Sequence, residues 1–422
     1  MKMKAAGSLG LITCLLLGAT PFPGTLSVNA TALEPAPAAT WAGHFGTLGA
    51  PLFVYLPLIM APDRPLPTGG VVGTITRPGF RPSALALDES RNRLFVFDEA
   101  THNIYIYNAT TLAEVGSVPT SLSDCLSMVV DESHGKLYAG DFGPGVIAAD
   151  RVAVIDTAGG SLLKYLPTAG GVYLVKDEVL DTVYFSSSGG APFDGGIYKI
   201  DVATDVTERI TGIWGNVYTS LAVNPLTHEL FVANWSQNDN NLFIINPTTL
   251  AVTPVPDLSG FGVAMNWMEN KAYITYCASA GMEGVCIYDR DTGTVTRTYT
   301  ANDGTQPLVF NPNVNRLYSD TEVNAVTTIF NGAADTFTNV TLEMSLTAVG
   351  VRHLTDNVYY AGWGGTYVMK GATGAVVAHY PTAGVSCTIC QSVVIVSQAT
   401  GRVYVVNDSS EGAIKVVQDG QY

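Results

Sequence analysis

The chain has 422 residues, of which 47% are hydrophobic and 14% are charged, with 43 Gly and 22 Pro. The apolar share excludes a disordered chain, and scarce charge with many turn formers favours short strands over long solvated helices or a coiled coil. With 21 Lys and Arg against 36 Asp and Glu, the formal net charge is −15, which disfavours nucleic acid as a partner.

Residues 1–30 are predicted to be an export signal. Two lysines among the first four residues precede a largely apolar stretch over residues 5–18, and small residues up to Ala30 provide a cleavage site. The stretch is short for a bilayer span, and no later window has the roughly 20 apolar residues of a membrane helix. A lipoprotein with lipid on Cys14 is the alternative, which the residue before it disfavours. We expect a secreted, periplasmic or cell-surface protein.

Residues 31–70 are rich in Ala and Pro and contain an apolar patch at residues 50–60. Pro51 and Pro57 argue against a helix there, so we expect an extended linker whose apolar patch packs on the folded body. A sorting or attachment role for the patch is the alternative.

After residue 70 the sequence repeats itself. Each unit has an apolar strand that ends at a polar residue, here called the anchor residue, then a short turn and a second strand that carries an aromatic residue. Two more strands follow, so each unit predicts four. The mean spacing of about 44 residues is typical of a propeller blade. The anchor residues are Asp88, Asp131, Asp177, Asn224, Asn266, Asn311, Arg352 and Ser397.

Eight units predict an all-β fold, a β-propeller of eight four-stranded blades over residues 71–422. Residues 71–76 resemble a fourth strand with no first three before it, whereas the last unit stops after a third strand at residues 413–417. The first segment is therefore predicted to complete the last blade, which leaves no open edge where the chain ends. Seven blades remain the alternative if the unit around Asp177 does not form one.

Two second strands carry a recognisable motif. They are Leu-Phe-Val-Ala-Asn at residues 230–234 and Val-Tyr-Val-Val-Asn at residues 403–407, and Asn-Pro pairs begin the turns at Asn224 and Asn311. This repeat resembles the YVTN repeat of bacterial and archaeal surface and periplasmic propellers. The resemblance covers about residues 71–420 and implies the propeller fold. It brings no active-site residues, because members of the family have diverse ligands.

One face of the predicted ring carries the variable connections. Turns on the other face are short and regular, and insertions confined to one face indicate the face that is free to evolve binding. Aromatic rings among amides and carboxylates suit a sugar or peptide, although the rings would also serve as filling between blades. The candidate ligand-binding residues are Phe142, Phe193, Trp214, Tyr218, Trp235, Phe261, Trp363, Asp141, Asp194 and Asp239.

These features favour an exported, non-catalytic propeller that binds a carbohydrate, peptide or protein through its loop-rich face. No nucleophile elbow, phosphate loop or His-Glu-x-x-His motif is present. A hydrolase or lyase that uses Asp141, Asp194 or Asp239 near the central channel is the alternative, and a structural or adhesive surface component is a third reading.

We expect no metal and no cofactor, and calcium only in the hydrolase or lyase alternative. The segment Asp289-Arg-Asp291 resembles the start of a calcium loop but lacks the later ligands, so we interpret it as a plain turn. No two of the six His have metal-ligand spacing.

Five cysteines follow the predicted signal. Cys277 and Cys286 flank a hairpin connection, so a disulfide is expected there in an oxidising compartment, worth roughly 2–3 kcal/mol. Cys387 and Cys390 form a CxxC pair, interpreted as a local disulfide with a redox pair as the alternative. Cys125 is then the odd thiol, either buried or paired with Cys387 or Cys390.

Overall fold

The computed structural model describes residues 69–141, 151–168, 173–187, 195–213, 220–234, 241–275, 277, 284–298, 308–319, 325–342, 346–362, 365–381, 393–407 and 412–420. The predicted signal, and the predicted linker up to residue 68, lie outside these residues. The described part contains β-strands and turns and no helix, so it holds no helix that would cross a membrane.

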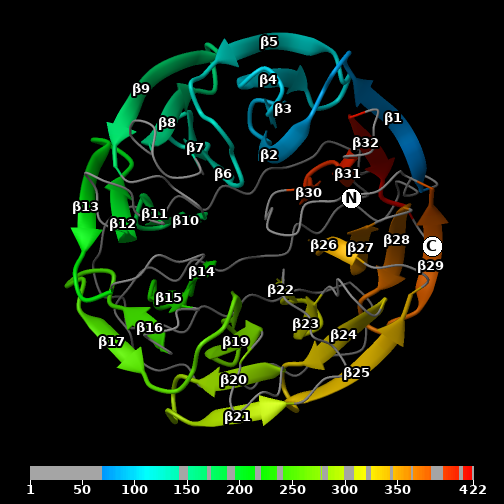
Figure 1. The fold of residues 1–422 in the computed structure, drawn as a ribbon. Helices are drawn as coiled ribbons and strands as arrows, with labels where there is room; N and C mark the ends of the chain where they lie inside the picture. The colour runs from blue at the N-terminus through cyan, green and yellow to red at the C-terminus, as the bar shows by residue number, and fades with distance from the viewer. Residues whose placement is uncertain are drawn as a thin grey trace, which may run out of the picture. The chain divides into compact units, whose positions relative to one another are not determined.

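The described strands form eight antiparallel sheets of four strands, and Figure 1 shows these sheets as blades around a ring. The first strand of each blade lies nearest the centre. These strands are β2 (Pro82–Asp88), β6 (Met128–Asp131), β10 (Leu174–Asp177), β14 (Ser220–Val223), β18 (Gly262–Asn266), β22 (Leu308–Asn311), β26 (Leu346–Arg352) and β30 (Val394–Val396).

Second and third strands form the middle of each blade. The second strands are β3 (Arg93–Asp98), β7 (Lys136–Gly140), β11 (Thr182–Ser187), β15 (Leu230–Ala233), β19 (Lys271–Thr275), β23 (Arg316–Ser319), β27 (Asn357–Gly362) and β31 (Arg402–Asn407). The third strands are β4 (Asn103–Asn108), β8 (Arg151–Asp156), β12 (Gly196–Asp201), β16 (Leu242–Ile245), β20 (Val285–Asp289), β24 (Val326–Asn331), β28 (Gly365–Lys370) and β32 (Ala413–Gln418).

Fourth strands lie on the rim of the ring (Figure 1). They are β5 (Glu114–Pro119), β9 (Ser161–Pro167), β13 (Val206–Ile210), β17 (Val252–Val255), β21 (Val295–Thr298), β25 (Thr336–Thr341), β29 (Val376–Tyr380) and β1 (Gly70–Thr76). The expectation of eight four-stranded blades is confirmed. The seven-blade alternative is wrong, because the unit around Asp177 forms the complete blade β10 to β13.

Burial follows the position of a strand in its blade. Every residue of β11 and of β27 is buried, whereas most of β25 on the rim is exposed. Aromatic and β-branched side chains of the second and third strands fill the space between neighbouring blades, with Tyr138, Phe185 and Tyr359 fully covered. The hydrophobic core therefore lies between the blades, and no blade has a core of its own.

The ring closes as predicted, by pairing of the two ends of the propeller. β1 runs antiparallel to β32, with Ile75 opposite Ile414 and Thr76 opposite Ala413, and Figure 1 shows the blue strand beside the dark red one. Arg402 and Tyr404 of the last blade donate hydrogen bonds to the carbonyl of Ala109 in the first blade. Closure thus joins segments at opposite ends of the sequence.

The cysteine predictions are partly answered. A disulfide joins Cys277 and Cys286, as expected. Cys125 has a free thiol and is buried, so the pairing alternatives proposed for it are wrong. Cys387 and Cys390 lie outside the described residues.

The eight anchor residues are buried at the end of the first strands. The side-chain oxygens of Asp177, Asn224 and Asn266 each accept hydrogen bonds from the backbone amides two and three residues later. Such Asx turns satisfy amides that no strand partner reaches. The anchor residue therefore fixes the turn to the second strand.

Four residues after each anchor, the chain adopts the left-handed conformation. The eight left-handed turn residues are Asn92, Gly135, Asp181, His228, Asn270, Asn315, Asp356 and Gly401. Gly, Asn and Asp tolerate this conformation better than most residues, which explains why the sequence uses them at this position.

Four of the anchor residues also bond to the left-handed turn residue of the next blade. Nδ2 of Asn224 donates to Oδ1 of Asn270 at 2.9 Å, and Nδ2 of Asn311 donates to Oδ1 of Asp356 at 2.7 Å. His228 Nδ1 lies 3.0 Å from Oδ2 of Asp177. We call this ring of anchor and left-handed turn residues the interblade belt. It lies on the face of the short turns and connects neighbouring blades.

Ile75→Ala tests the closing strand. Ile75 is buried and packs into the core between the last and first blades, so its truncation is expected to lower the free energy of unfolding by about 2–5 kcal/mol. Val72→Ala on the same strand removes a half-exposed side chain and is expected to change it by less than about 0.5 kcal/mol. Urea denaturation followed by circular dichroism measures both, and equal effects would argue against closure by β1.

Asn266→Ala tests the interblade belt. The variant leaves the amides of Met268 and Glu269 and the amide oxygen of Asn315 without the partner that Asn266 provides. Since Asn266 is fully buried, we expect a loss of about 2–3 kcal/mol in the same denaturation assay. Thr338→Ala, on the exposed strand β25, is the control and is expected to remain within about 0.5 kcal/mol of the parent. A small loss for Asn266→Ala would mean that the belt adds little to stability.

Candidate functional site

The strand ends that are joined by connections of variable length all lie on one face of the ring. The turns from first to second strand are nearly uniform, for example residues 132–135 and 267–270. The connections from second to third strand range from residues 363–364 to residues 141–150. Because strands alternate in direction, the connections from fourth to first strand emerge on this same face. We call it the loop-rich face.

Most of the predicted ligand-binding residues lie in these connections, and eight of the ten lie outside the described residues. These eight are Phe142, Phe193, Trp214, Tyr218, Trp235, Trp363, Asp194 and Asp239. The structure describes the other two, Asp141 and Phe261. They belong to the second and fifth blades, which are not neighbours in the ring, so these two residues do not form one site.

Phe261 directly precedes β18 and is half-buried. Its backbone amide donates a hydrogen bond to the carbonyl of Thr275, which places it where the loop-rich face meets the first strand of the fifth blade. Backbone pairing therefore positions Phe261, and this residue is partly exposed to solvent.

Asp141 directly follows β7 and is buried, with 5% of its surface exposed. Its Oδ1 accepts hydrogen bonds from the backbone amides of Ser123 at 2.8 Å and Asp124 at 3.2 Å. Its own amide donates to the carbonyl of Arg151 at the start of β8. Asp141 thus holds together the connection into β6 and the two strands beside it.

Asp124 lies beside Asp141 and was not among the predicted site residues. Burial, together with the negative charges of Glu99 and Asp141, raises the pKa of Asp124 to about 6. Arg81 acts in the opposite direction but is paired with Glu99 at 3.1 Å. Among the described residues, the buried Oδ1 of Asp124 has no hydrogen-bond partner.

Asp124 and Asp141 therefore form a carboxyl pair with different environments. One accepts two backbone hydrogen bonds, and the other gains a proton near pH 6. A protonated carboxyl donates a hydrogen bond while a carboxylate only accepts, so the pair suits a ligand with hydroxyl or amide groups. Environments that separate the behaviour of two carboxyls are also the ones used in acid and base chemistry.

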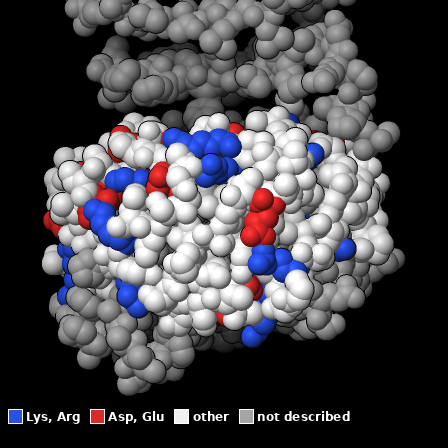
Figure 2. Space-filling view, turned by 90° about the horizontal axis from the view of Figure 1, so that it is seen from above, with Lys and Arg blue, Asp and Glu red and all other residues white. Residues whose placement is uncertain are grey.

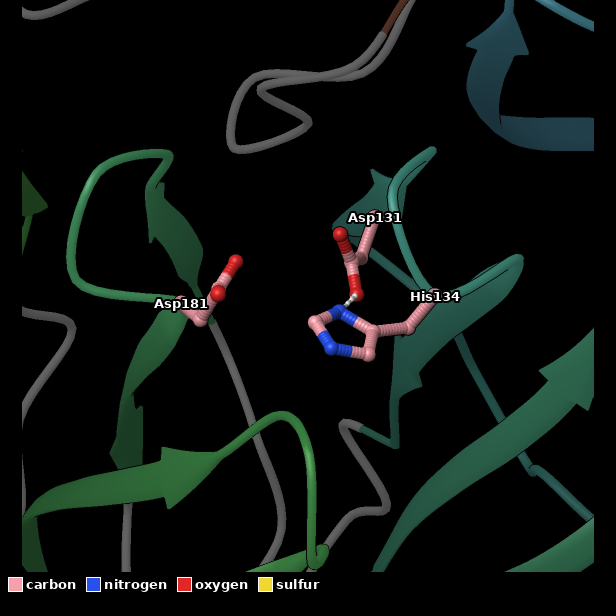
Figure 3. Close-up of side chains that lie close together, drawn as sticks. All are labelled: Asp131, His134 and Asp181. Carbon is pink, nitrogen blue, oxygen red and sulfur yellow. Dashed lines mark hydrogen bonds and ion pairs between the residues drawn. The ribbon is translucent and has the colours of Figure 1, made fainter. Parts of the chain in front are cut away.

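Only one group of Asp, His, Glu and Cys side chains among the described residues has atoms close enough to hold a metal ion. It consists of Asp131, His134 and Asp181 (Figure 3). It lies at the short turns, on the face opposite the Asp124 and Asp141 pair. Sequence spacing did not reveal it, because Asp181 comes from the next repeat. Its signal was present in the repeat itself, since Asp181 stands four residues after an anchor residue.

Asp124→Asn tests the raised pKa. Because the folded protein holds this proton more tightly than the unfolded chain, the contribution of Asp124 to stability is present below pH 3.8 and is lost as pH rises through about 6. The variant lacks this loss, so its melting temperature relative to the parent is expected to increase between pH 4 and pH 8. Glu208→Gln, on the exposed side of β13, is the control. A difference that does not change with pH would contradict the raised pKa.

No family model and no curated protein sequence matches this chain. Solved structures do. Sqt1 from Saccharomyces cerevisiae is 12% identical, with a TM-score of 0.64 over 84% of this chain and 100% of that chain. BamB from Moraxella catarrhalis is 11% identical, with a TM-score of 0.59 over 83% and 100%. The β-propeller domain of Cps50 (Swd1) from Myceliophteria thermophila is 10% identical, with a TM-score of 0.51 over 83% and 99%. At such low identity the similarity concerns the fold alone, an eight-bladed β-propeller.

Proposed function

We propose that this chain is an exported binding propeller that takes a carbohydrate, peptide or protein segment on its loop-rich face, without catalysis. The observation that carries the proposal is the contrast between the two faces. The interblade belt fixes the turns of one face at nearly constant length, whereas the other face carries connections of widely different length. Loops positioned by a rigid scaffold are the usual place for recognition.

The carboxyl pair supports a polar ligand. Asp124 and Asp141 lie on the loop-rich face, where Asp141 accepts backbone hydrogen bonds and Asp124 is able to donate one when it gains a proton near pH 6. Figure 2 shows one side of the molecule, where Lys and Arg are interspersed with Asp and Glu among a majority of other residues. This mixed surface and the net charge of −15 favour a ligand that is bound by hydrogen bonds and aromatic side chains over a ligand that carries phosphate.

Three observations support export. The disulfide between Cys277 and Cys286 belongs to an oxidising compartment. The second strands resemble the YVTN repeat of exported propellers, and residues 1–30 read as a signal. We therefore propose a secreted, periplasmic or cell-surface location and membership of the YVTN-type repeat family.

One observation favours a second function, that of a hydrolase or lyase. The raised pKa of Asp124 beside the Asp141 carboxylate is an arrangement that a general acid and a general base require. The two functions predict different behaviour, because a catalytic pair turns over a substrate whereas a binding pair retains it.

Glycan and peptide arrays probed with the purified chain test the proposal. We expect selective binding that Trp214→Ala combined with Trp235→Ala reduces at least about tenfold, because buried aromatic anchors carry much of the affinity of such sites. Leu226→Ser is the matched control, since Leu226 is 64% exposed on the opposite face. If the double tryptophan variant still binds and Leu226→Ser does not, the ligand binds on the face of the short turns, which contradicts the proposal.

Chromogenic glycosides and esters separate the two functions. Turnover that Asp124→Asn abolishes would favour the hydrolase or lyase, whereas binding without turnover supports the proposed function. Circular dichroism melting of each variant shows whether a loss of binding reflects a loss of fold.

A further inference from the structure

One junction of the interblade belt differs from the others. At four junctions the anchor residue and the next left-handed turn residue are joined by a hydrogen bond or an ion pair. At two more, the left-handed turn residue is glycine and the guanidinium of Arg91 or Arg352 lies against it. At a seventh junction, between the last blade and the first, the anchor residue is Ser397 and the left-handed turn residue is Asn92, and neither is charged. At the junction of the second and third blades, two carboxylates occupy these positions, those of Asp131 and Asp181.

Asp131 is fully buried and already has two kinds of partner. Its Oδ1 accepts hydrogen bonds from Lys176 at 2.8 Å and Ser133 at 2.6 Å. Its Oδ2 faces Nδ1 of His134 at 2.8 Å. The lysine therefore occupies one oxygen, and the other oxygen is directed at the imidazole.

Asp181 supplies the third side chain. It is exposed, and in the described part of the chain its carboxylate makes no hydrogen bond or ion pair. One ligand atom from each of Asp131, His134 and Asp181 lies within 4.8 Å of the other two. Figure 3 shows Asp181, on the β10 to β11 turn, across the junction from Asp131 at the end of β6 and His134 on the β6 to β7 turn.

Local charge leaves the junction anionic. Lys176 also pairs with Glu178, so one ammonium group stands among the carboxylates of Asp131, Asp181 and Glu178. Two like charges at the positions that elsewhere form a bond oppose the contact between blades. A cation between Asp131 and Asp181 would replace that missing bond.

We propose that Asp131, His134 and Asp181 bind a divalent transition-metal ion of the zinc or manganese class, which joins the second and third blades. One imidazole nitrogen with two carboxylate oxygens is a donor set that these ions accept, whereas calcium and magnesium favour oxygen alone. Ligands at about 2.0–2.2 Å from an ion lie no more than about 4.4 Å apart, so a small rotation of the exposed Asp181 completes the site. His134 and Asp181 face solvent, which leaves positions for water.

Calorimetric titration of the chelator-treated full chain with zinc, manganese, calcium and magnesium chlorides tests this. We expect one equivalent of zinc or manganese to bind more tightly than calcium or magnesium. At a concentration roughly 100-fold above Kd, the melting temperature is expected to rise by about 2–4 °C. Failure of both transition metals to bind, or tighter binding of calcium, would overturn the proposal.

Asp181→Asn and His134→Gln are each expected to weaken binding of the metal by at least about tenfold. Asparagine occupies the same left-handed position at Asn270 and Asn315, so Asp181→Asn is expected to keep the metal-free melting temperature or to raise it. His228→Asn is the matched control, because His228 faces a single carboxylate at the next junction. Metal binding that is unchanged in Asp181→Asn and His134→Gln, or lost equally in His228→Asn, would contradict the assignment.

Discussion

The fold depends on one interaction that recurs around the ring, the hydrogen bonding of the buried polar residue at the end of each first strand. In Asn224, Asn266 and Asn311 the side-chain oxygen fixes the turn of its own blade, and the amide nitrogen reaches the next blade. A buried amide whose groups are all bonded adds stability, whereas one with a missing partner is costly. Because no blade has a core of its own, these contacts and the apolar surfaces between blades stabilise one another.

This constraint divides the molecule into two faces with different freedom. A turn that begins at a buried anchor and passes through a left-handed residue has little tolerance for insertion, and the strand bounds show nearly constant lengths there. Connections on the opposite face start and end at strands that are already paired, so their length affects neither the turn nor the junction. Recognition on the loop-rich face is therefore compatible with a ring whose stability resides in the other face and in the core.

Much of this architecture could be read from the sequence. The repeat predicted eight blades and the closing strand, because the anchor residues and the aromatic residues of the second strands recur at a fixed spacing. The disulfide was predicted from two cysteines that flank one hairpin connection. Asp124 could not be identified, since its raised pKa depends on burial and on the charges of Glu99 and Asp141. The group of Asp131, His134 and Asp181 was missed because it joins two units, so only a comparison of equivalent positions in neighbouring units could have indicated the contact.

The two junctions that contain histidine show how the belt accommodates a buried carboxylate. Asp177 is paired with His228, which the next blade supplies at the left-handed position. Asp131 is paired with His134 of its own turn and with Lys176 of the first strand of the next blade. The left-handed position of that next blade is occupied by Asp181, which is acidic. Both residues have the left-handed backbone conformation, with φ of 46° at Asp181 and 60° at His228. The Asx turn and the left-handed conformation fix this backbone independently of the side chain at the left-handed position. One junction of the belt can therefore have an ion-binding group in place of a direct bond, while the fold of the blade stays the same.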